Sequence, residues 1–289
     1  MEPLDSTKQI WDEALSRYTP YATVLALSGG NDSRATYFAA KALNIKIDAI
    51  LHINTRTGIQ QTSEWVRWFA DEYAKLPLIE ADAGNSYENY VLRKGFFGVG
   101  TGKVSSAHTM AYHILKAKHL TKALSQHIRQ GKRNRKIFIL NGARIAESAN
   151  RKSNLNQPVR ADRVDKDGKD KSSNIWVNLC HHWSKQNCAD ICDENHAPQN
   201  PVARELCRSG ECMCGTTQGQ QARIEASALY PEWGAWIDGL ESRVKEKFPW
   251  GWGEPVSQNW QSEKRGQLRL FDADFQPMCS TCTATATEV

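Results

Sequence analysis

Residues 24–33 of this 289-residue chain read VLALSGGNDS, an apolar run followed directly by a turn of small residues. The next stretch, residues 34–43, has a helical pattern. A strand that delivers a glycine-rich turn to a helix N-terminus brings backbone N–H groups together, and the helix dipole adds positive potential there. The stretch therefore predicts a phosphate-binding turn, formed by Ser28, Gly29, Gly30, Asn31, Asp32 and Ser33.

The order of residues in this turn excludes two common phosphate-binding motifs. A Walker P-loop has four residues between its glycines and then a lysine, whereas no lysine follows Gly29 and Gly30. The dinucleotide motif G-x-G-x-x-G spaces its glycines differently. The remaining alternative is an ordinary strand-to-helix turn that happens to be rich in small residues.

Alternating apolar patterns on either side of the turn predict an α/β fold. Strands are expected at residues 23–27, 47–53, 78–81 and 137–141. Helices are expected at residues 6–18, 34–43, 64–76 and 107–127. This alternation predicts a doubly wound parallel sheet with helices on both faces, plus a small cysteine-rich C-terminal region. Ligands of such sheets bind at the carboxyl ends of the strands, which is where the motifs fall.

The strand–helix alternation fades after about residue 150, where polar sequence rich in lysine and aspartate begins. We therefore expect a nucleotide-binding domain over residues 1–155 and a Cys- and Trp-rich region over residues 156–282. Residues 283–289 have the composition of a disordered tail.

Charge and composition narrow the class of protein. The net charge is +5, and the excess is concentrated in residues 129–136 and 151–171, as in a solvated loop or a site for a polyanionic substrate. No apolar stretch approaches membrane-spanning length, and the first residues do not read as a signal peptide. We expect a cytoplasmic protein with no membrane partner. Eight cysteines in a reducing compartment favour metal, cluster or redox chemistry over disulfides.

A second motif follows the last predicted strand, where residues 141–151 read NGARIAESANR. Arg144 and Arg151 lie about two helical turns apart, with the carboxylate of Glu147 between them. Guanidinium groups bind phosphates bidentately, and a neighbouring carboxylate can hold one of them in place. The alternative is a helix-surface ion pair of little energy. The candidate phosphate-binding residues here are Gly142, Arg144, Glu147, Ser148 and Arg151.

The cysteines of the C-terminal half form a third signal. Residues 207–215 read CRSGECMCG, and residues 279–282 read CSTC. Four thiolates brought together bind either zinc or an iron–sulfur cluster, and spacing alone does not separate the two. The candidate ligands are Cys207, Cys212, Cys214, Cys279 and Cys282. Because five thiols compete for four places, one of them could be a sulfur-carrying thiol instead.

Two further groups of side chains have competing interpretations. Cys180, Cys188 and Cys192 could be ligands, but buried structural thiols are the favoured interpretation. The C-terminal tryptophans could stack nucleobases, although packing in a small domain is favoured for them. These are Trp233, Trp236, Trp250 and Trp252.

The patterns SGGxDS and GxRxxESxxR together resemble the PP-loop ATP pyrophosphatase family, which includes the phosphoadenylylsulfate (PAPS) reductase-like, adenine nucleotide alpha hydrolase-like proteins. The resemblance implies ATP as substrate, with Mg²⁺ shared between its phosphates and Asp32. It also implies that Arg144 and Arg151 offset charge as pyrophosphate leaves, so that Asp32, Arg144 and Arg151 are catalytic.

Two shorter segments also resemble parts of this family. Thr55 and Gly58 match a turn that lies under the bound nucleotide, although turn chemistry alone would explain the glycine. The segment from Gly95 onward resembles sulfonucleotide reductase relatives. It places His108, Tyr112 and Lys116 on one helix face, as phosphate contacts or as structural residues. Of these, His108 and Lys116 join the candidate nucleotide-binding residues.

The cysteine set resembles that of adenylylsulfate reductases and DNA phosphorothioation ATP pyrophosphatases. This implies a [4Fe-4S] cluster, with zinc as the alternative, and Cys207 as a catalytic thiol. The implied function is adenylylation of a substrate oxygen coupled to sulfur transfer into DNA or tRNA. A sulfur donor such as a cysteine desulfurase, and other subunits of a sulfur-modification complex, would be its partners.

Three alternatives stay open. PAPS or adenylylsulfate reductases share residues 23–151, but their PP-loop is degenerate and they carry a C-terminal catalytic cysteine motif that this chain lacks. The small subunit of ATP sulfurylase has an intact PP-loop without needing the cysteines. The third is a non-catalytic subunit that binds a nucleotide or a cluster.

Overall fold

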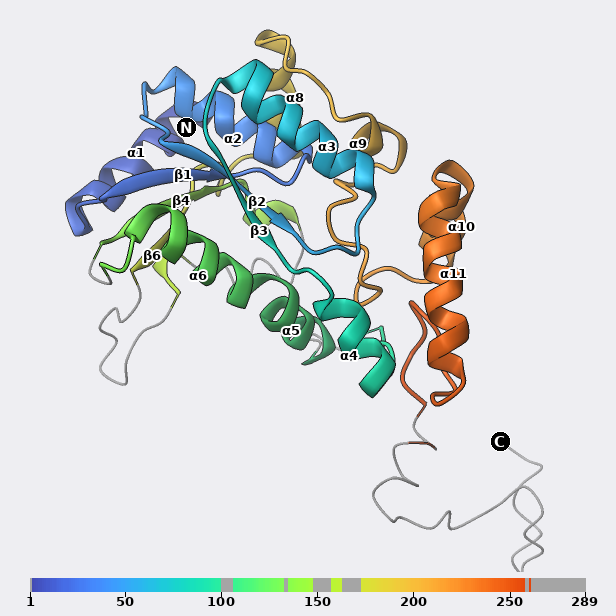
Figure 1. Ribbon diagram of the computed structural model, residues 1–289. Coiled ribbons are helices and arrows are strands. Elements are labelled where there is room, and N and C mark those ends of the chain that lie inside the picture. Colours follow the sequence, from blue (N-terminus) through green and yellow to red (C-terminus); the bar gives the residue numbers. More distant parts are fainter. Residues whose placement is uncertain are drawn as a thin grey trace, which may run out of the picture. The chain divides into compact units, whose positions relative to one another are not determined.

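A six-stranded sheet with the order β3-β2-β1-β4-β6-β5 forms the centre of the protein (Figure 1). The computed structural model describes residues 2–99, 106–132, 135–147, 157–162, 173–257 and 260. The chain divides into two compact units, Met1–Pro255 and Val256–Val289, and the sheet belongs to the first. The strands are β1 (Ala22–Ala26), β2 (Ala49–Asn54), β3 (Leu78–Asp82), β4 (Ile137–Asn141), β5 (Val159–Ala161) and β6 (Asn174–Asn178). All pairings are parallel except that of β5 with β6.

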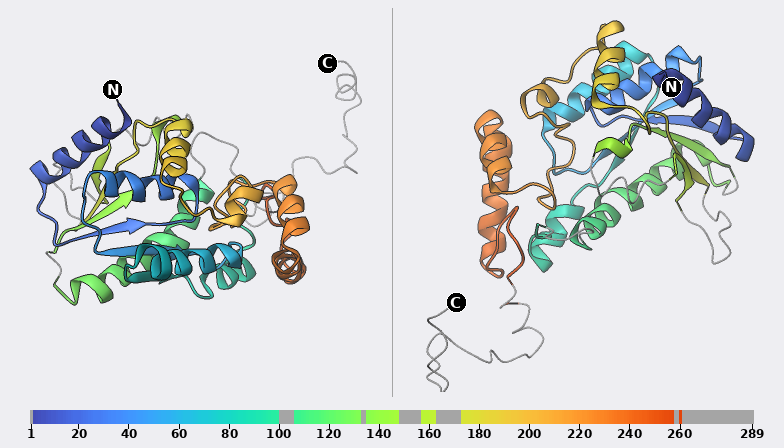
Figure 2. Two further views of the ribbon diagram at one scale, coloured as in Figure 1. Left: turned by 90° about the horizontal axis from the view of Figure 1, so that it is seen from above. Right: turned by 180° about the vertical axis from the view of Figure 1, so that it is seen from behind.

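Helices cover both faces of the sheet, which confirms the predicted doubly wound α/β fold (Figures 1 and 2). Successive side chains of a strand point to opposite faces, so Leu25 of β1 joins one core and Val24 joins the other. The first core lies under α1 (Pro3–Arg17), α2 (Asn31–Ala42), α3 (Gln60–Trp68) and α8 (Lys185–Glu194). The second core lies under α6 (Lys118–Leu124), which continues α5 (Ser106–Tyr112).

Two of the predicted helices differ in detail from the observed ones. The helix expected at residues 64–76 begins at Gln60 and ends in a π-helical turn, η1 (Phe69–Ala74). The helix expected at 107–127 contains two such turns, η2 (His113–Ala117) and η3 (Ser125–Arg129). Lys75 and Gln130, which follow η1 and η3, adopt the left-handed conformation and donate their N–H groups to carbonyls five residues earlier. The apolar period alone does not distinguish these wider turns from α-helix.

Two of the six strands, β5 and β6, come from beyond residue 155. All of β6 is buried, because it pairs with β4 on one side and with β5 on the other. The division into domains at residue 155 stays a prediction, and the predicted tail lies outside the described residues. The remaining helices are α4 (Ser86–Lys94), η4 (Ile145–Glu147), α9 (Pro201–Glu205), α10 (Gln220–Leu229) and α11 (Pro231–Lys245). Within the described ranges, no helix has the length and apolar character needed to cross a membrane.

The end of β4 lies directly against the start of α2. A Cβ atom on Gly142 would sit 2.4 Å from the backbone oxygen of Asp32 and 2.8 Å from Oγ1 of Thr36. Only a glycine allows this approach without displacing backbone. The contact sets the position of the turn that precedes α2 relative to the second motif.

Gly142→Ala is expected to lower the free energy of unfolding by about 1–3 kcal/mol, because the added methyl group overpacks this contact. Gly239→Ala is the matched control, because a Cβ there meets nothing within 4 Å. Gly239 lies inside α11, so its replacement should stabilise the protein by about 1 kcal/mol. Urea unfolding of the two variants measures both effects. Equal effects of the two substitutions would contradict the proposed close approach.

Candidate nucleotide and thiol site

The turn between β1 and α2 has the geometry of an anion site. Gly29 has a φ of +78°, and Ser33 Oγ donates to the carbonyl of Gly30 at 2.9 Å, which closes the turn. Gly30 precedes the first residue of α2 and has no side chain with which to cap it. The first N–H groups of a helix have no partner within the helix, so those of Asn31, Asp32 and Ser33 face the turn. With the helix dipole, they favour an anion there.

An ion pair joins the turn to the second motif. Nε of Arg144 donates to Oδ2 of Asp32 at 2.9 Å, and the arginine side chain is only 7% exposed. Burial acts to lower the pKa of Arg144, but the hydrogen bond and charge of Asp32, with a contribution from Glu147, raise it overall. The structure thus brings together the two motifs that lie more than a hundred residues apart. Ser148 and Arg151 lie outside the described residues.

The side chain of Asn200 connects the turn to the cysteine-rich segment. Asn200 is fully buried, and its Nδ2 lies 3.2 Å from the carbonyl of Gly29 and 3.4 Å from that of Ser209. Thr62 completes the group, since its Oγ1 donates to the same Ser209 carbonyl at 2.7 Å. Ser209 also packs on Gly30, whose added Cβ would lie 3.3 Å from the serine Cβ. The cysteine-rich segment therefore lies against the phosphate turn.

The turn after β2 holds the same segment in place. A Cβ on Gly58 would lie 2.3 Å from the carbonyl oxygen of Glu211, so the glycine allows the two backbones to touch. Thr55 Oγ1 donates to that carbonyl at 2.9 Å, and Thr57 Oγ1 accepts from the N–H of Met213 at 3.1 Å. The structure places Thr55 and Gly58 against the cysteine-rich segment. Their predicted contact with a nucleotide stays a prediction.

Cys212 and Cys214 form a pair of thiols, of which Cys214 is buried and Cys212 is partly buried. A hydrogen bond from Cys212 holds the pKa of Cys214 below its usual range, with Thr216 and the charge of Lys116 acting in the same direction. The same hydrogen bond, together with burial, raises the pKa of Cys212 well above its usual range. The pair therefore favours one thiol and one thiolate, with the thiolate on Cys214.

Charged and polar side chains from the helix beyond α4 face this pair. Nζ of Lys116 lies 2.8 Å from Oε2 of Glu211, whose side chain is 7% exposed. Burial acts to lower the pKa of Lys116, but the negative charges of Glu211 and Cys212 outweigh burial and raise this pKa overall. Nδ1 of His108 lies 3.1 Å from Oγ1 of Thr216. Both predicted phosphate contacts, His108 and Lys116, thus lie beside the thiol pair in this structure.

The structure describes three of the five predicted metal ligands, Cys207, Cys212 and Cys214. Cys207 is exposed and has a φ of +53°, and it does not join Cys212 and Cys214. In the part of the chain that the structure describes, no three His, Cys, Asp or Glu side chains are arranged to hold a metal ion. Cys279 and Cys282 lie outside that part. The [4Fe-4S] cluster and its zinc alternative stay predictions.

Three other thiols lie in the core beneath the turn. Cys180, Cys188 and Cys192 are all buried between the sheet, α2 and α8. Sγ of Cys180 lies 3.6 Å from Oγ1 of Thr36. A hydrogen bond between Cys180 and Cys188 raises the pKa of Cys188. Burial raises the pKa of Cys192 to about 11. The burial of all three thiols in a packed core agrees with their structural interpretation.

The sequence gives no local signal for the contacts that join the segments. Asn200 followed by proline is a recognisable helix start, and Asn200 does cap α9 by accepting from the N–H of Val202. Its contact with Gly29 is tertiary and has no local signal. Glu211 and Thr216 have no distinguishing pattern either, because their partners come from the distant helix that carries Lys116.

Comparison with known proteins gives structural neighbours only. No family model and no curated protein matches the chain. Its structure is similar to a PAPS reductase from Candida auris in complex with phosphate, with 15% identity, a TM-score of 0.43, and coverage of 71% of this chain and 84% of that one. A Candida glabrata FMN adenylyltransferase with FAD and pyrophosphate has 14% identity, a TM-score of 0.44, and coverage of 70% and 60%.

A third similar structure is the U34-tRNA thiolase NcsA from Methanococcus maripaludis, with its [4Fe-4S] cluster. It has 12% identity and a TM-score of 0.38, and the match covers 94% of this chain and 91% of that one. The sequence identities and TM-scores of all three neighbours are low. The description of the fold and the site therefore rests on this chain's own strand order, motifs and contacts.

Lys116→Met is expected to lower the free energy of unfolding by about 3 kcal/mol, because it leaves the Glu211 carboxylate buried without its counter-ion. Lys75→Met is the matched control. Its nitrogen is also 2.8 Å from a carboxylate, that of Glu72, but the two side chains are 67% and 59% exposed. Such a pair contributes about 0–1 kcal/mol. Urea unfolding at pH 7 measures both losses.

Adding Glu211→Gln to the Lys116→Met variant should recover much of the loss, because it removes the uncompensated charge. Equal losses for Lys116→Met and Lys75→Met would show that the Lys116–Glu211 pair is not buried in solution.

Proposed function

We propose that this protein cleaves ATP between its α and β phosphates, adenylylates an oxygen of a nucleic-acid acceptor, and passes sulfur to the activated position. The ion pair between Asp32 and Arg144 is the observation that carries this proposal. It joins an intact SGGxDS turn to the second motif at the carboxyl edge of adjacent strands. Ligands of parallel sheets bind at this edge.

The turn and Arg144 have separate roles in the proposed reaction. Backbone N–H groups at the start of α2 bind the phosphates, and Arg144 offsets negative charge. The acceptor oxygen attacks the α-phosphorus, the bond to the bridging oxygen breaks, and its electron pair leaves with pyrophosphate. Asp32 is the residue that would hold Mg²⁺, since carboxylate and phosphate oxygens are its preferred ligands. Bound there, the ion would neutralise phosphate charge.

The cysteine-rich segment would supply the second half of the reaction. AMP is a good leaving group, so a sulfur nucleophile can displace it from the adenylylated acceptor. Cys207 is exposed and lies two residues from Ser209, which packs on Gly30 of the turn. This position suits a thiol that carries sulfur delivered by a donor such as a cysteine desulfurase. Cys212 and Cys214 would provide two ligands of a [4Fe-4S] cluster.

The net charge of +5 supports a polyanionic acceptor such as DNA or tRNA. Part of the basic run 129–136 has a role within the fold. Arg129 donates to the side chain of Asn174, and the guanidinium of Arg135 lies 3.8 Å from the ring centroid of Tyr21. The acceptor is therefore proposed by chemical class alone.

Anaerobically purified protein, incubated with ATP, Mg²⁺, a cysteine desulfurase with cysteine as sulfur donor, and either bulk tRNA or duplex DNA, should form AMP and pyrophosphate in equal amounts. Arg144→Lys should slow their formation about 10–100-fold, because a lysine cannot reproduce the guanidinium's charge-assisted bonds to Asp32 and phosphate. Arg67→Lys is the matched control. Arg67 of α3 also binds a carboxylate, that of Glu80 in β3, but neither residue belongs to the turn or to the second motif.

Chromatography of the nucleotide products and a coupled pyrophosphate assay provide the measurement. Formation of ADP and phosphate would contradict cleavage at the α-phosphorus. An Arg144→Lys rate equal to that of Arg67→Lys would contradict the assigned site. Calorimetry covers the case of a missing acceptor, since failure to bind ATP at all would also contradict the proposal.

A further inference from the structure

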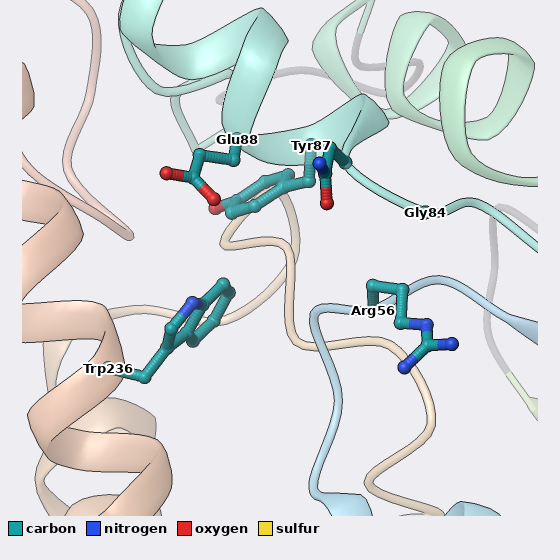
Figure 3. Close-up of a pocket in the computed structure, with 6 residues that line it drawn as sticks. Arg56, Gly84, Tyr87, Glu88 and Trp236 are labelled. Carbon is teal, nitrogen blue, oxygen red and sulfur yellow. The ribbon is translucent and has the colours of Figure 1, made fainter.

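One tryptophan of the C-terminal group behaves differently from the others. Trp233, Trp250 and Trp252 are each 6% exposed or less, and their indole N–H groups donate to backbone carbonyls of the first half of the chain or of the cysteine-rich segment. Packing, the favoured interpretation, holds for these three. Trp236 of α11 is instead half-buried, and its ring forms one wall of a cavity of about 420 Å³ (Figure 3).

The cavity combines flat rings with polar groups whose charges are already balanced. It is lined by Arg56, Gly84, Asn85, Tyr87, Glu88 and Trp236. The guanidinium of Arg56 binds Asp82 through two nitrogens, and Glu88 is paired with Arg243. A bare anion would have to compete with these carboxylates. A neutral, planar heterocycle suits the cavity better, because it can stack on indole and form hydrogen bonds through its edge.

The pose of Arg56 is fixed by the backbone around it. Its φ of +59° is uncommon for a residue with a side chain, and its N–H donates to Oδ1 of Asn54 at 3.0 Å. Residues held in such conformations concentrate at ligand sites. In Figure 3, Arg56 and Trp236 lie on either side of the open space, below Tyr87 and Glu88 of α4.

The cavity shares its walls with the thiol pair. Tyr87 Oη donates to the carbonyl of Cys214 at 3.1 Å, so the ring that lines the cavity also contacts the cysteine-rich segment. Arg56 lies between Thr55 and Thr57, whose hydroxyls bind the backbone of that segment. A ligand in the cavity would therefore lie beside the thiols.

We infer that this cavity binds a nucleobase, stacked on Trp236, with its polar edge toward Asn85 and Glu88. The inference rests on the proposed function in one respect: the base would belong to the nucleic acid that accepts sulfur. The same chemistry would also recognise the base of a free nucleotide, and the experiment below separates these two sources.

The experiment measures binding of single strands of about 12 nucleotides by fluorescence anisotropy, without ATP. One strand carries its bases and the other is abasic with the same backbone. The full-length protein should bind the base-bearing strand about tenfold more tightly or better, since one stacked base contributes about 1–3 kcal/mol. Trp236→Ala should remove this preference and leave the affinity for the abasic strand unchanged.

Trp68→Ala is the matched control, because Trp68 is another tryptophan with an accessible ring, 44% exposed, and lies on α3 away from the cavity. It should keep the preference. Trp236→Leu provides a second variant that retains apolar packing against Tyr87 while losing the π-face. Circular dichroism confirms that each variant is folded.

Mononucleotides added as competitors identify the source of the base. Competition at concentrations similar to those of the strand would show a site for free nucleotides, and its absence would show a site for a base within a polynucleotide. Either result supports the inference. Equal binding of base-bearing and abasic strands, or a preference that survives both Trp236 substitutions, would overturn it. Because ATP is absent, these outcomes are independent of pyrophosphate release.

Discussion

The buried carboxamide of Asn200 is the interaction on which the candidate site depends. Its nitrogen lies within hydrogen-bonding distance of the Gly29 carbonyl in the phosphate turn and of the Ser209 carbonyl in the cysteine-rich segment. Losing it would leave two buried carbonyls without this donor, which is costly in a closely packed interior. A single side chain thus joins the two segments, so the candidate phosphate turn lies against the cysteine-rich segment.

Electrostatics reinforces this arrangement. The ammonium of Lys116 pairs with the Glu211 carboxylate, and its charge favours a thiolate on Cys214. On the other side of the turn, Arg144 is held by Asp32. Each cation therefore already has an anionic partner in the protein.

Local sequence signals predicted four of the six strands, the turn after β1 and the location of the two motifs at the carboxyl ends of their strands, but not β5 or β6. Apolar alternation and turn chemistry depend on neighbouring residues, and parallel strands bring their carboxyl ends to one edge, so the approach of Asp32 and Arg144 followed from the fold. The contacts of Gly58 and Lys116 could not be predicted in this way. Both residues meet Glu211, which is far away in sequence, and no periodic pattern reports such a pair.

The rate at which thiols react in the native protein tests most directly whether the turn and the thiol pair form one site. In metal-free Asn200→Ala, a pulse of iodoacetamide followed by peptide mass spectrometry should show Cys212 and Cys214 reacting about tenfold faster or more than in the unsubstituted protein, since several hydrogen bonds that hold their segment are lost. Cys207, exposed in the intact protein, is the internal reference and should react at an unchanged rate. Unchanged labelling of Cys212 and Cys214 would contradict a site held together by Asn200.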